Sequence, residues 1–173
     1  MRPSGSSGPD LCAKLLIFCG IPGSGKTTVA GLVAQRLKRA VHLQTDSFRV
    51  AIAVPTYSSA ESKFVYRAMI AAGREALKSG YDTILDGTFP REEFRREAVM
   101  TLKRYYDIVE IVNLWCDPET AYARNLRRVK PVPEESFFRL YRQFEIPSEA
   151  IRIDTAKVSP EDAAEIVLAS LPA

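Results

Sequence analysis

The sequence predicts an α/β protein in which a mainly parallel, five-stranded sheet lies between layers of helices. Short apolar runs rich in β-branched residues alternate along the chain with longer segments of helical periodicity, which is the pattern of βαβ units. The chain has 173 residues, 46% of them hydrophobic, which suits one compact domain with a single core. Residues 1–12, which begin with a stretch rich in Gly, Ser and Pro, are expected to form a flexible N-terminal arm, and residues 13–173 the domain.

The elements follow from the spacing of apolar residues. Leu15–Cys19 is a near-continuous apolar run, as expected for a central strand covered on both faces. Lys26–Leu37 has helical periodicity, and Glu61–Lys78 does too, stopped by Gly80. The other expected elements, in chain order, are a strand at 40–43, a strand at 83–85, a helix at 91–104, a strand at 108–115, a helix opened by Asp117-Pro118, a helix at 134–144, a strand at 151–154 and a last helix from Ser159-Pro160 to about residue 170.

Composition excludes several classes of protein. No run approaches the ~20 apolar residues that a membrane-spanning helix needs, so no membrane role is expected. The cysteines Cys12, Cys19 and Cys116 are too few and too dispersed for a disulfide framework or a zinc site. Buried thiols and the lack of a targeting signal favour the cytoplasm. The net charge of +3 permits an anionic substrate without requiring one.

One motif indicates nucleotide binding. Residues 20–27 read Gly-Ile-Pro-Gly-Ser-Gly-Lys-Thr, which matches GxxxxGK[ST] between a predicted strand and a predicted helix, the context of a P-loop. Phosphate oxygens need several backbone N–H donors around one concavity, and a Gly-rich turn lets the backbone approach closely. The residues expected to bind ATP are Gly20, Pro22, Gly23, Ser24, Gly25, Lys26, Thr27 and Thr28. The sequence therefore predicts a three-layer α/β/α P-loop NTPase sandwich.

Within the P-loop proteins, three classes compete. A GTPase should carry an Asn-Lys-x-Asp guanine reader after its fourth strand, where this chain has Asn113-Leu114-Trp115-Cys116-Asp117. A remodelling ATPase normally has an extra helical domain, for which 173 residues leave little room. Small size and short late helices therefore favour a kinase that acts on a nucleotide or a small substrate.

Asp46 is the candidate general base. It follows the second predicted strand, at the edge where ligands of parallel sheets gather, and a positioned base contributes typically ~10²–10⁴-fold to proton abstraction from a hydroxyl. Arg49, about one helical turn on, is the candidate ligand for an acceptor phosphate or carboxylate. The alternative is that Asp46 caps a helix together with Ser47.

Candidate residues for the metal, the acceptor and the phosphoryl group come from the P-loop and from the segments after the third and fourth predicted strands. Asp86 can hold a metal-bound water, and Thr27 can ligate Mg²⁺ directly, although Asp86-Gly87 could also be a simple turn. Thr88 is a candidate contact to the acceptor. A basic stretch predicts a mobile lid at about residues 122–133, whose Arg124 and Arg128 would cover the transferred phosphoryl group.

Two groups of residues favour packing or solvation over catalysis. His42, the single histidine of the chain, lies within the second predicted strand and is expected to pack there. The basic residues of the helix at 91–104 could follow a nucleic-acid backbone, but a solvated face is favoured. They are Arg91, Arg95, Arg96, Lys103 and Arg104.

Taken together, these motifs resemble the polynucleotide-kinase-like branch of P-loop kinases, which includes the zeta-toxin-like and seryl-tRNA-kinase-like proteins. The resemblance covers about residues 15–169 and rests on residues 20–28, Asp46-Ser47-Phe48-Arg49, Asp86-Gly87-Thr88, Arg124-Asn125, Val132-Pro133-Glu134 and residues 143–147. It implies ATP as donor, Mg²⁺ as cofactor, Asp46 as base and Arg49 as acceptor-phosphate ligand. It also places the lid arginines near the phosphoryl group and the loop after Asp154 against adenine.

The chain departs from this family at one point. Members often have an Asn two residues after the Asp that ends the third strand, whereas Thr88-Phe89 follows Asp86-Gly87 here. The expected function is transfer of the γ-phosphate of ATP to a hydroxyl. The acceptor is open between a 5′-hydroxyl nucleic-acid end, a small molecule and an aminoacyl-tRNA, and the alternative is a nucleotide-binding ATPase without an acceptor.

Overall fold

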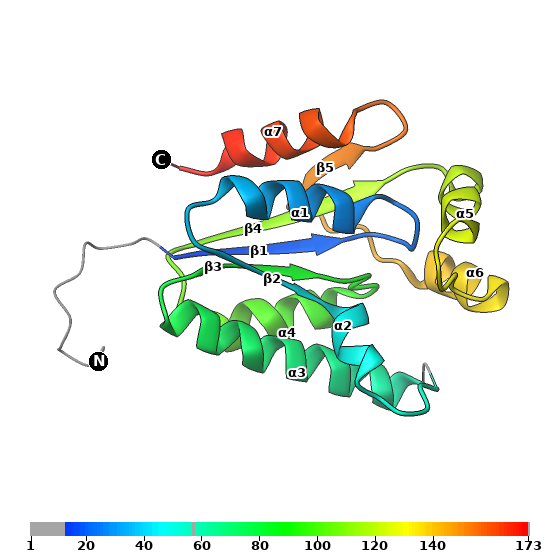
Figure 1. Ribbon diagram of the computed structural model, residues 1–173, viewed down its shortest axis with the longest axis horizontal. Helices are drawn as coiled ribbons and strands as arrows, with labels where there is room; N and C mark the ends of the chain where they lie inside the picture. The colour runs from blue at the N-terminus through cyan, green and yellow to red at the C-terminus, as the bar shows by residue number, and fades with distance from the viewer. Residues whose placement is uncertain (1–12, 57, 173) are drawn as a thin grey trace, which may run out of the picture.

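The computed structural model describes residues 13–56 and 58–172, which leaves the predicted N-terminal arm and Cys12 outside the described residues. Within this part of the chain, five parallel strands form one sheet in the order β2-β3-β1-β4-β5 (Figure 1). The strands are β1 (Lys14–Cys19), β2 (Ala40–Gln44), β3 (Asp82–Asp86), β4 (Ile108–Trp115) and β5 (Ile151–Asp154). The predicted parallel sheet is thereby confirmed.

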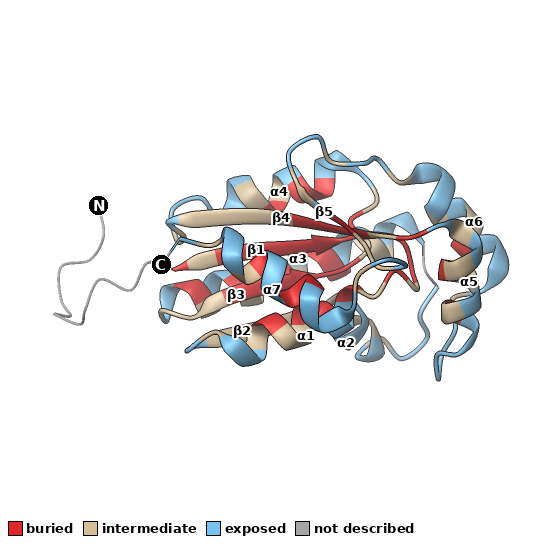
Figure 2. Cartoon of the chain, turned by 90° about the horizontal axis from the view of Figure 1, so that it is seen from above, coloured by how far each residue is buried: buried red, intermediate tan, exposed pale blue. Residues whose placement is uncertain are grey.

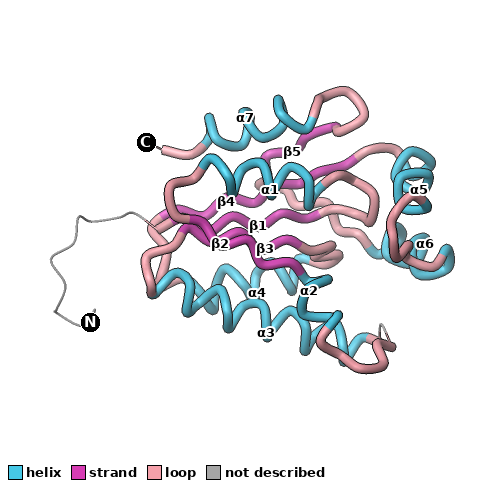
Figure 3. Tube along the Cα trace, in the orientation of Figure 1, coloured by secondary structure: helices cyan, strands magenta, loops and turns pink. Residues whose placement is uncertain are grey.

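Helices connect the strands and cover both faces of the sheet. They are α1 (Lys26–Arg36), α2 (Thr45–Val50), α3 (Ser59–Lys78), α4 (Glu92–Leu102), α5 (Pro118–Leu126), α6 (Glu134–Gln143) and α7 (Pro160–Ser170). Figures 1 and 3 show α1 and α7 on one face and α3 and α4 on the other, so the architecture is the three-layer α/β/α sandwich expected. Among the described residues, no helix is long and apolar enough to cross a membrane.

The central strand β1 explains how the layers are held together. Its side chains alternate between the two faces, as the pleat of a strand requires. Leu15 and Ile17 belong to the cluster beneath α3 and α4, whereas Leu16 and Phe18 belong to the cluster beneath α1 and α7. All of these side chains are fully buried, and Figure 2 shows the buried residues concentrated along the middle strands. The near-continuous apolar run of this strand thus results from burial on both sides.

The helix starts agree with the sequence signals. Asp117 accepts a hydrogen bond from the amide of Thr120 at 2.8 Å and is followed by Pro118, and Ser159 caps α7 in the same way. The short helix α2 was not predicted as an element. Asp46 lies in its first turn, while Gln44 occupies the N-cap position without a side-chain bond, so Asp46 does not cap the helix.

The carboxyl ends of the strands carry a separate small cluster. Ile21, Cys116, Ala121 and Phe137 pack together there and join the loop after β1 to α5 and α6. Figure 1 shows α5 and α6 beyond this edge of the sheet, away from the layers. Helices α5 and α6 therefore border the edge of the sheet where ligands gather in parallel sheets.

Candidate active site

The loop after β1 has the backbone shape that phosphate binding requires. Gly20, Gly23 and Gly25 have φ values of 145°, 81° and 85°, a region that side chains disfavour. A Cβ on Gly23 would lie 2.0 Å from the carbonyl oxygen of Ala121, so the loop approaches α5 more closely than any side chain allows. Helix α1 begins at Lys26, and its N-cap residue, Gly25, has no side chain to bond the first amides, which are therefore placed to donate to an anion.

Lys26 places its ammonium group inside this loop. The residue is only 8% exposed, and Nζ donates to the carbonyl oxygen of Ile21 at 2.8 Å and to Oγ of Ser24 at 3.5 Å. Burial lowers the pKa of Lys26, and the nearby carboxylate of Asp86 opposes that shift. The phosphate-binding loop thus holds a cation that is positioned before any ligand arrives.

A cavity of about 460 Å³ opens beside the loop at the carboxyl ends of the strands. Of the residues predicted to bind ATP, Gly20 and Ser24 are buried and are not among the lining residues, and the rest line the cavity. Those lining it are Pro22, Gly23, Gly25, Lys26, Thr27 and Thr28. Asp46, Arg49, Asp86, Thr88, Arg124 and Arg128 line it too, so the residues predicted for different roles come together in one cavity.

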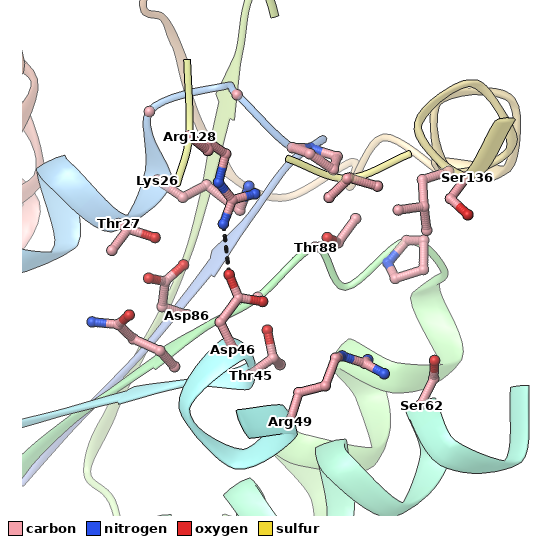
Figure 4. A pocket seen from close by; sticks show the side chains of 18 of the residues that line it. Lys26, Thr27, Thr45, Asp46, Arg49, Ser62, Asp86, Thr88, Arg128 and Ser136 are labelled. Atoms are coloured by element: carbon pink, nitrogen blue, oxygen red, sulfur yellow. Dashed lines mark hydrogen bonds and ion pairs between the residues drawn. The ribbon is translucent and has the colours of Figure 1, made fainter. Parts of the chain in front are cut away.

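Asp86 and Thr27 form an oxygen-rich corner of this cavity (Figure 4). Asp86 ends β3 and is 3% exposed. Its Oδ2 lies 3.1 Å from Nε2 of His42 on the neighbouring strand β2, and because an ionised carboxylate only accepts hydrogen bonds, the imidazole donates. His42 was expected to pack within its strand, yet it contacts the carboxylate predicted for the metal site.

The corner suits a magnesium ion that is held partly by phosphate. A hydroxyl and a carboxylate are ligands that Mg²⁺ accepts, and the ion commonly takes one or two protein oxygens together with substrate phosphates and water. Across the described residues, no group of three His, Cys, Asp or Glu side chains could hold a metal by itself. The chemistry of Thr27 and Asp86 therefore fits an ion that is shared with the phosphates of a nucleotide.

Asp46 faces Arg128 across the cavity. Nη2 of Arg128 donates to Oδ2 of Asp46 at 2.6 Å, and Figure 4 shows this contact beside Lys26. The side chains of Arg128 and Asp46 are 37% and 64% exposed, so solvent weakens the pair. The predicted base and one predicted lid arginine thus meet directly.

Arg124 lies in the last turn of α5, where the predicted lid begins, and it is held there by hydrogen bonds. It donates to Oγ1 and to the carbonyl oxygen of Thr155, at 2.9 Å and 3.0 Å. The hydroxyl of Thr155 in turn donates to the carbonyl oxygen of Ser24 at 3.1 Å. The segment after β5 is therefore bonded to both the P-loop and α5, and Arg124 is the side chain that joins it to α5.

The turn after β3 is strained and firmly held. Phe89 has a φ of 43°, which is unusual for a residue with a side chain, and it is fully buried. Its amide donates to Oη of Tyr66 at 2.8 Å, and its carbonyl oxygen accepts from Nη1 of Arg95 at 2.7 Å. The carbonyl oxygen of the preceding residue, Thr88, accepts from the amide of Gly20 at 3.2 Å, so the turn also supports the P-loop.

Arg95 corrects one expectation of the sequence analysis. It was counted among the solvated basic residues of its helix, but it is 3% exposed. It shares the buried stripe of α4 with Ala98 and Leu102, and this helical spacing was a signal that it faces inward. Other contacts that sequence reasoning missed, such as His42 with Asp86, join residues far apart in the chain and had no local signal.

Arg49 lies at the far end of the cavity from the P-loop. It forms an ion pair with Glu61, and the two side chains are 14% and 9% exposed. Glu61 had not been identified as a functional candidate. The cation predicted to bind an acceptor phosphate therefore has a protein carboxylate beside it.

Comparisons with known proteins agree with this geometry. A family model described as an AAA domain, AAA_33, matches residues 15–147. Among solved structures, the chain is similar to an unliganded sugar kinase from Janibacter sp. HTCC2649, with 20% identity, a TM-score of 0.71 and coverage of 91% of this chain and 93% of that one. It is similar to the Mycobacterium tuberculosis APS kinase CysC in complex with AMPPNP and APS, with 18% identity, a TM-score of 0.73 and coverage of 91% and 96%.

A third likeness is to a chain of the Pnkp1/Rnl/Hen1 complex. The identity is 22%, the TM-score 0.61, and the match covers 89% of this chain but 50% of that one. At identities this low, each likeness establishes the fold alone.

Proposed function

The chain belongs to the AAA domain family of P-loop proteins represented by AAA_33, and on that premise we propose that it is a kinase that transfers the γ-phosphate of ATP to an alcohol. The observation that carries the proposal is the placement of Asp46. Its carboxylate lines the same cavity as Lys26 and Thr27, on the side opposite the loop that would hold the triphosphate. A pure nucleotide-binding site has no need of a carboxylate there, whereas an alcohol acceptor must lose a proton at that place.

The proposed reaction assigns one task to each side chain. The acceptor oxygen attacks the γ-phosphorus, the bond between that phosphorus and the β–γ bridging oxygen breaks, and ADP leaves. The acceptor proton passes to a carboxylate oxygen of Asp46. Lys26 neutralises charge on the β- and γ-phosphates, and phosphoryl transfer depends mainly on such positioning and neutralisation.

Magnesium and the lid arginines complete the proposal. Thr27 and, through water, Asp86 would hold Mg²⁺, which when bound supplies positive charge beside the transferred group. Arg128 approaches the cavity from the predicted lid and is the arginine we assign to the phosphoryl group. Arg124, bonded to Thr155, is assigned to the nucleotide side, where it keeps the segment after Asp154 in place.

Two acceptor classes follow from the fold neighbours. One of those proteins is named a sugar kinase, and another belongs to a complex that a second solved structure describes as an RNA repair complex. A small polyol and a 5′-hydroxyl nucleic-acid end are therefore the acceptors to test first. The cytoplasmic location inferred from the sequence stays a prediction.

The test uses ATP labelled at the γ-phosphate. Wild-type protein is incubated with polyols and with an oligonucleotide that ends in a 5′-hydroxyl, and the label in acceptor and in free phosphate is counted. We expect label on an acceptor, loss of transfer in Asp46→Asn with ADP binding retained, and loss of turnover in Lys26→Ala. Exposed Glu149→Gln and Lys38→Ala are the matched controls. Release of free phosphate alone, unaffected by any acceptor or by Asp46→Asn, would instead support an ATPase without an acceptor.

A further inference from the structure

The contact between Arg49 and Glu61 bears on what the acceptor can be. Arg49 lies in the last turn of α2 and lines the cavity, and Glu61 lies in the first turn of α3 behind it. Figure 4 shows the guanidinium of Arg49 pointing toward Ser62, away from Thr27 and Lys26. Arg49 therefore lies in the part of the cavity that the triphosphate would leave to the acceptor, with Glu61 bonded to it from behind the cavity wall.

Glu61 is fixed in place by more than its partner. Its Oε2 accepts a hydrogen bond from Oγ1 of Thr56 at 2.8 Å and also accepts from the amide of the same residue. Its own amide donates to Oγ of Ser58, the N-cap of α3, at 3.2 Å. The bonds from Thr56 thus hold the carboxylate beside Arg49, and the bond to Ser58 holds the backbone that carries it.

A fixed, nearly buried carboxylate changes what Arg49 can bind. An anionic group that approached the guanidinium would also approach Glu61, and like charges placed together at a binding site are strongly penalised. Breaking the ion pair to admit the anion would leave a buried charge without its partner, which is unfavourable too. A hydroxyl meets neither penalty, because it can donate to the carboxylate and accept from the guanidinium.

The other side chains at this end suit a neutral, hydroxylated ligand. Thr88, Ser62 and Ser136 supply hydroxyl groups, and the rings of Tyr66 and Phe94 supply apolar surface. Besides Arg49, this end of the cavity is lined by Arg139, which is exposed and donates to Oγ of Ser136 at 3.5 Å. Arg128, which donates to Asp46, is assigned to the transferred phosphoryl group and so belongs to the nucleotide side of the cavity.

We propose that Glu61 determines acceptor specificity: by cancelling the charge of Arg49, it makes the site select an uncharged polyhydroxy compound and reject phosphate monoesters. This inference rests on the proposed kinase function. It replaces the expectation that Arg49 binds an acceptor phosphate, and it favours a small polyol over a nucleic-acid end.

The experiment compares polyols with their own phosphate monoesters. Glycerol, ribose, glucose and inositol, and one monoester of each, are titrated by calorimetry into protein saturated with Mg²⁺ and AMPPNP, which fills the nucleotide site. The proteins are wild type, Glu61→Gln and the double variant Arg49→Gln/Glu61→Gln, with exposed Glu119→Gln as control. Glutamine keeps the size of Glu61 and can still accept from Thr56.

We expect wild type to bind the polyols in preference to the monoesters. Glu61→Gln should bind at least one monoester at least about tenfold more tightly than wild type, because the repulsive charge is gone. The double variant should lose that gain, since it also lacks the guanidinium. Wild type that binds monoesters as well as the polyols, or Glu61→Gln that gains nothing, would overturn the proposal.

The nucleotide serves as an internal check. The affinity for AMPPNP with Mg²⁺ should be equal in all the proteins, because none of these positions lies in the P-loop. Failure of wild type to bind AMPPNP would refute the kinase function itself. An intact affinity with an unchanged preference for acceptors would refute only the role of Glu61. Circular dichroism verifies that each variant is folded.

Discussion

The close approach of the P-loop to α5 can be tested with glycine-to-alanine substitutions whose surroundings differ. At Gly23 an added Cβ would lie 2.0 Å from the carbonyl oxygen of Ala121, in a backbone conformation with φ of 81°. At Gly25 the φ is similar, but the nearest atom would be a side-chain carbon of Thr155 at 3.6 Å. At Gly31, within α1, nothing lies within 4 Å. The same substitution therefore adds backbone strain and a clash at Gly23, backbone strain alone at Gly25, and neither at Gly31.

The magnitudes follow from these surroundings. Gly25→Ala should lower the free energy of unfolding by about 1–2 kcal/mol, the cost of a left-handed residue with a side chain. Gly23→Ala adds a backbone clash, for which overpacking costs about 1–3 kcal/mol more, so the total is about 2–5 kcal/mol. Gly31→Ala should raise the free energy of unfolding by about 0.5–1 kcal/mol, because alanine is the better residue in a helix interior.

Urea unfolding followed by circular dichroism, without nucleotide, measures all the variants on one scale. Calorimetry with ADP and Mg²⁺ then shows whether the loop still binds phosphate, and Gly23→Ala should bind most weakly. If Gly23→Ala were no less stable than Gly25→Ala, the P-loop would not lie against α5 as described. If Gly31→Ala were destabilised as well, alanine would lower stability even where it causes no strain or clash, and the argument from strain would fail.

Three other perturbations have definite expected outcomes. Replacing His42 by alanine removes the donor to Asp86, which should lower the free energy of unfolding by about 1.5–3 kcal/mol and raise the Mg²⁺ concentration needed for ADP binding in calorimetry. An unchanged Mg²⁺ dependence would contradict this. Burial raises the pKa of Cys19 from 9.0 to about 11, so the folded state holds the proton longer than the unfolded state. Stability present below pH 9 should therefore fall by up to about 3 kcal/mol as the pH rises to 11, and urea titrations of Cys19→Ala should show a shallower decline. Arg128→Ala should change the free energy of unfolding by less than about 1 kcal/mol, because its pair with Asp46 is exposed, while phosphoryl transfer falls about 10³-fold. A large loss of stability in that variant would show a structural role instead.

Most of the fold could be predicted because its signals are local. The predicted bounds of β4 and β5 agree with the structure, since a strand buried in a parallel sheet is a short apolar run between turn residues. The short helix α2 was missed because its 6 residues are too few to show a periodic pattern. Its first residues also follow a strand without an N-cap side chain, so no start signal marked it.

Sequence reasoning could propose the site residues that lie within one segment of the chain, but it could not predict the contacts between segments. The P-loop is one contiguous motif, and Asp46 and Asp86 were proposed because each comes at the end of a strand; the structure places both in the wall of the cavity. The partner of Asp86 is His42, on another strand 44 residues away, and only the register of the sheet brings the two together. Glu61 lies closer in sequence to Arg49, but their contact depends on how the chain turns between α2 and α3.

The left-handed backbone at Phe89 leaves this position with no improving substitution. Glycine would relieve the dihedral strain, yet it would empty the space against the ring of Tyr66, whose centroid lies 4.7 Å from that of the Phe89 ring. Any apolar residue larger than glycine would fill part of this space, but its side chain would retain the strain of the positive φ. Selection for thermal tolerance would therefore have to act elsewhere in the chain, and a laboratory library randomised at this codon should return mostly phenylalanine.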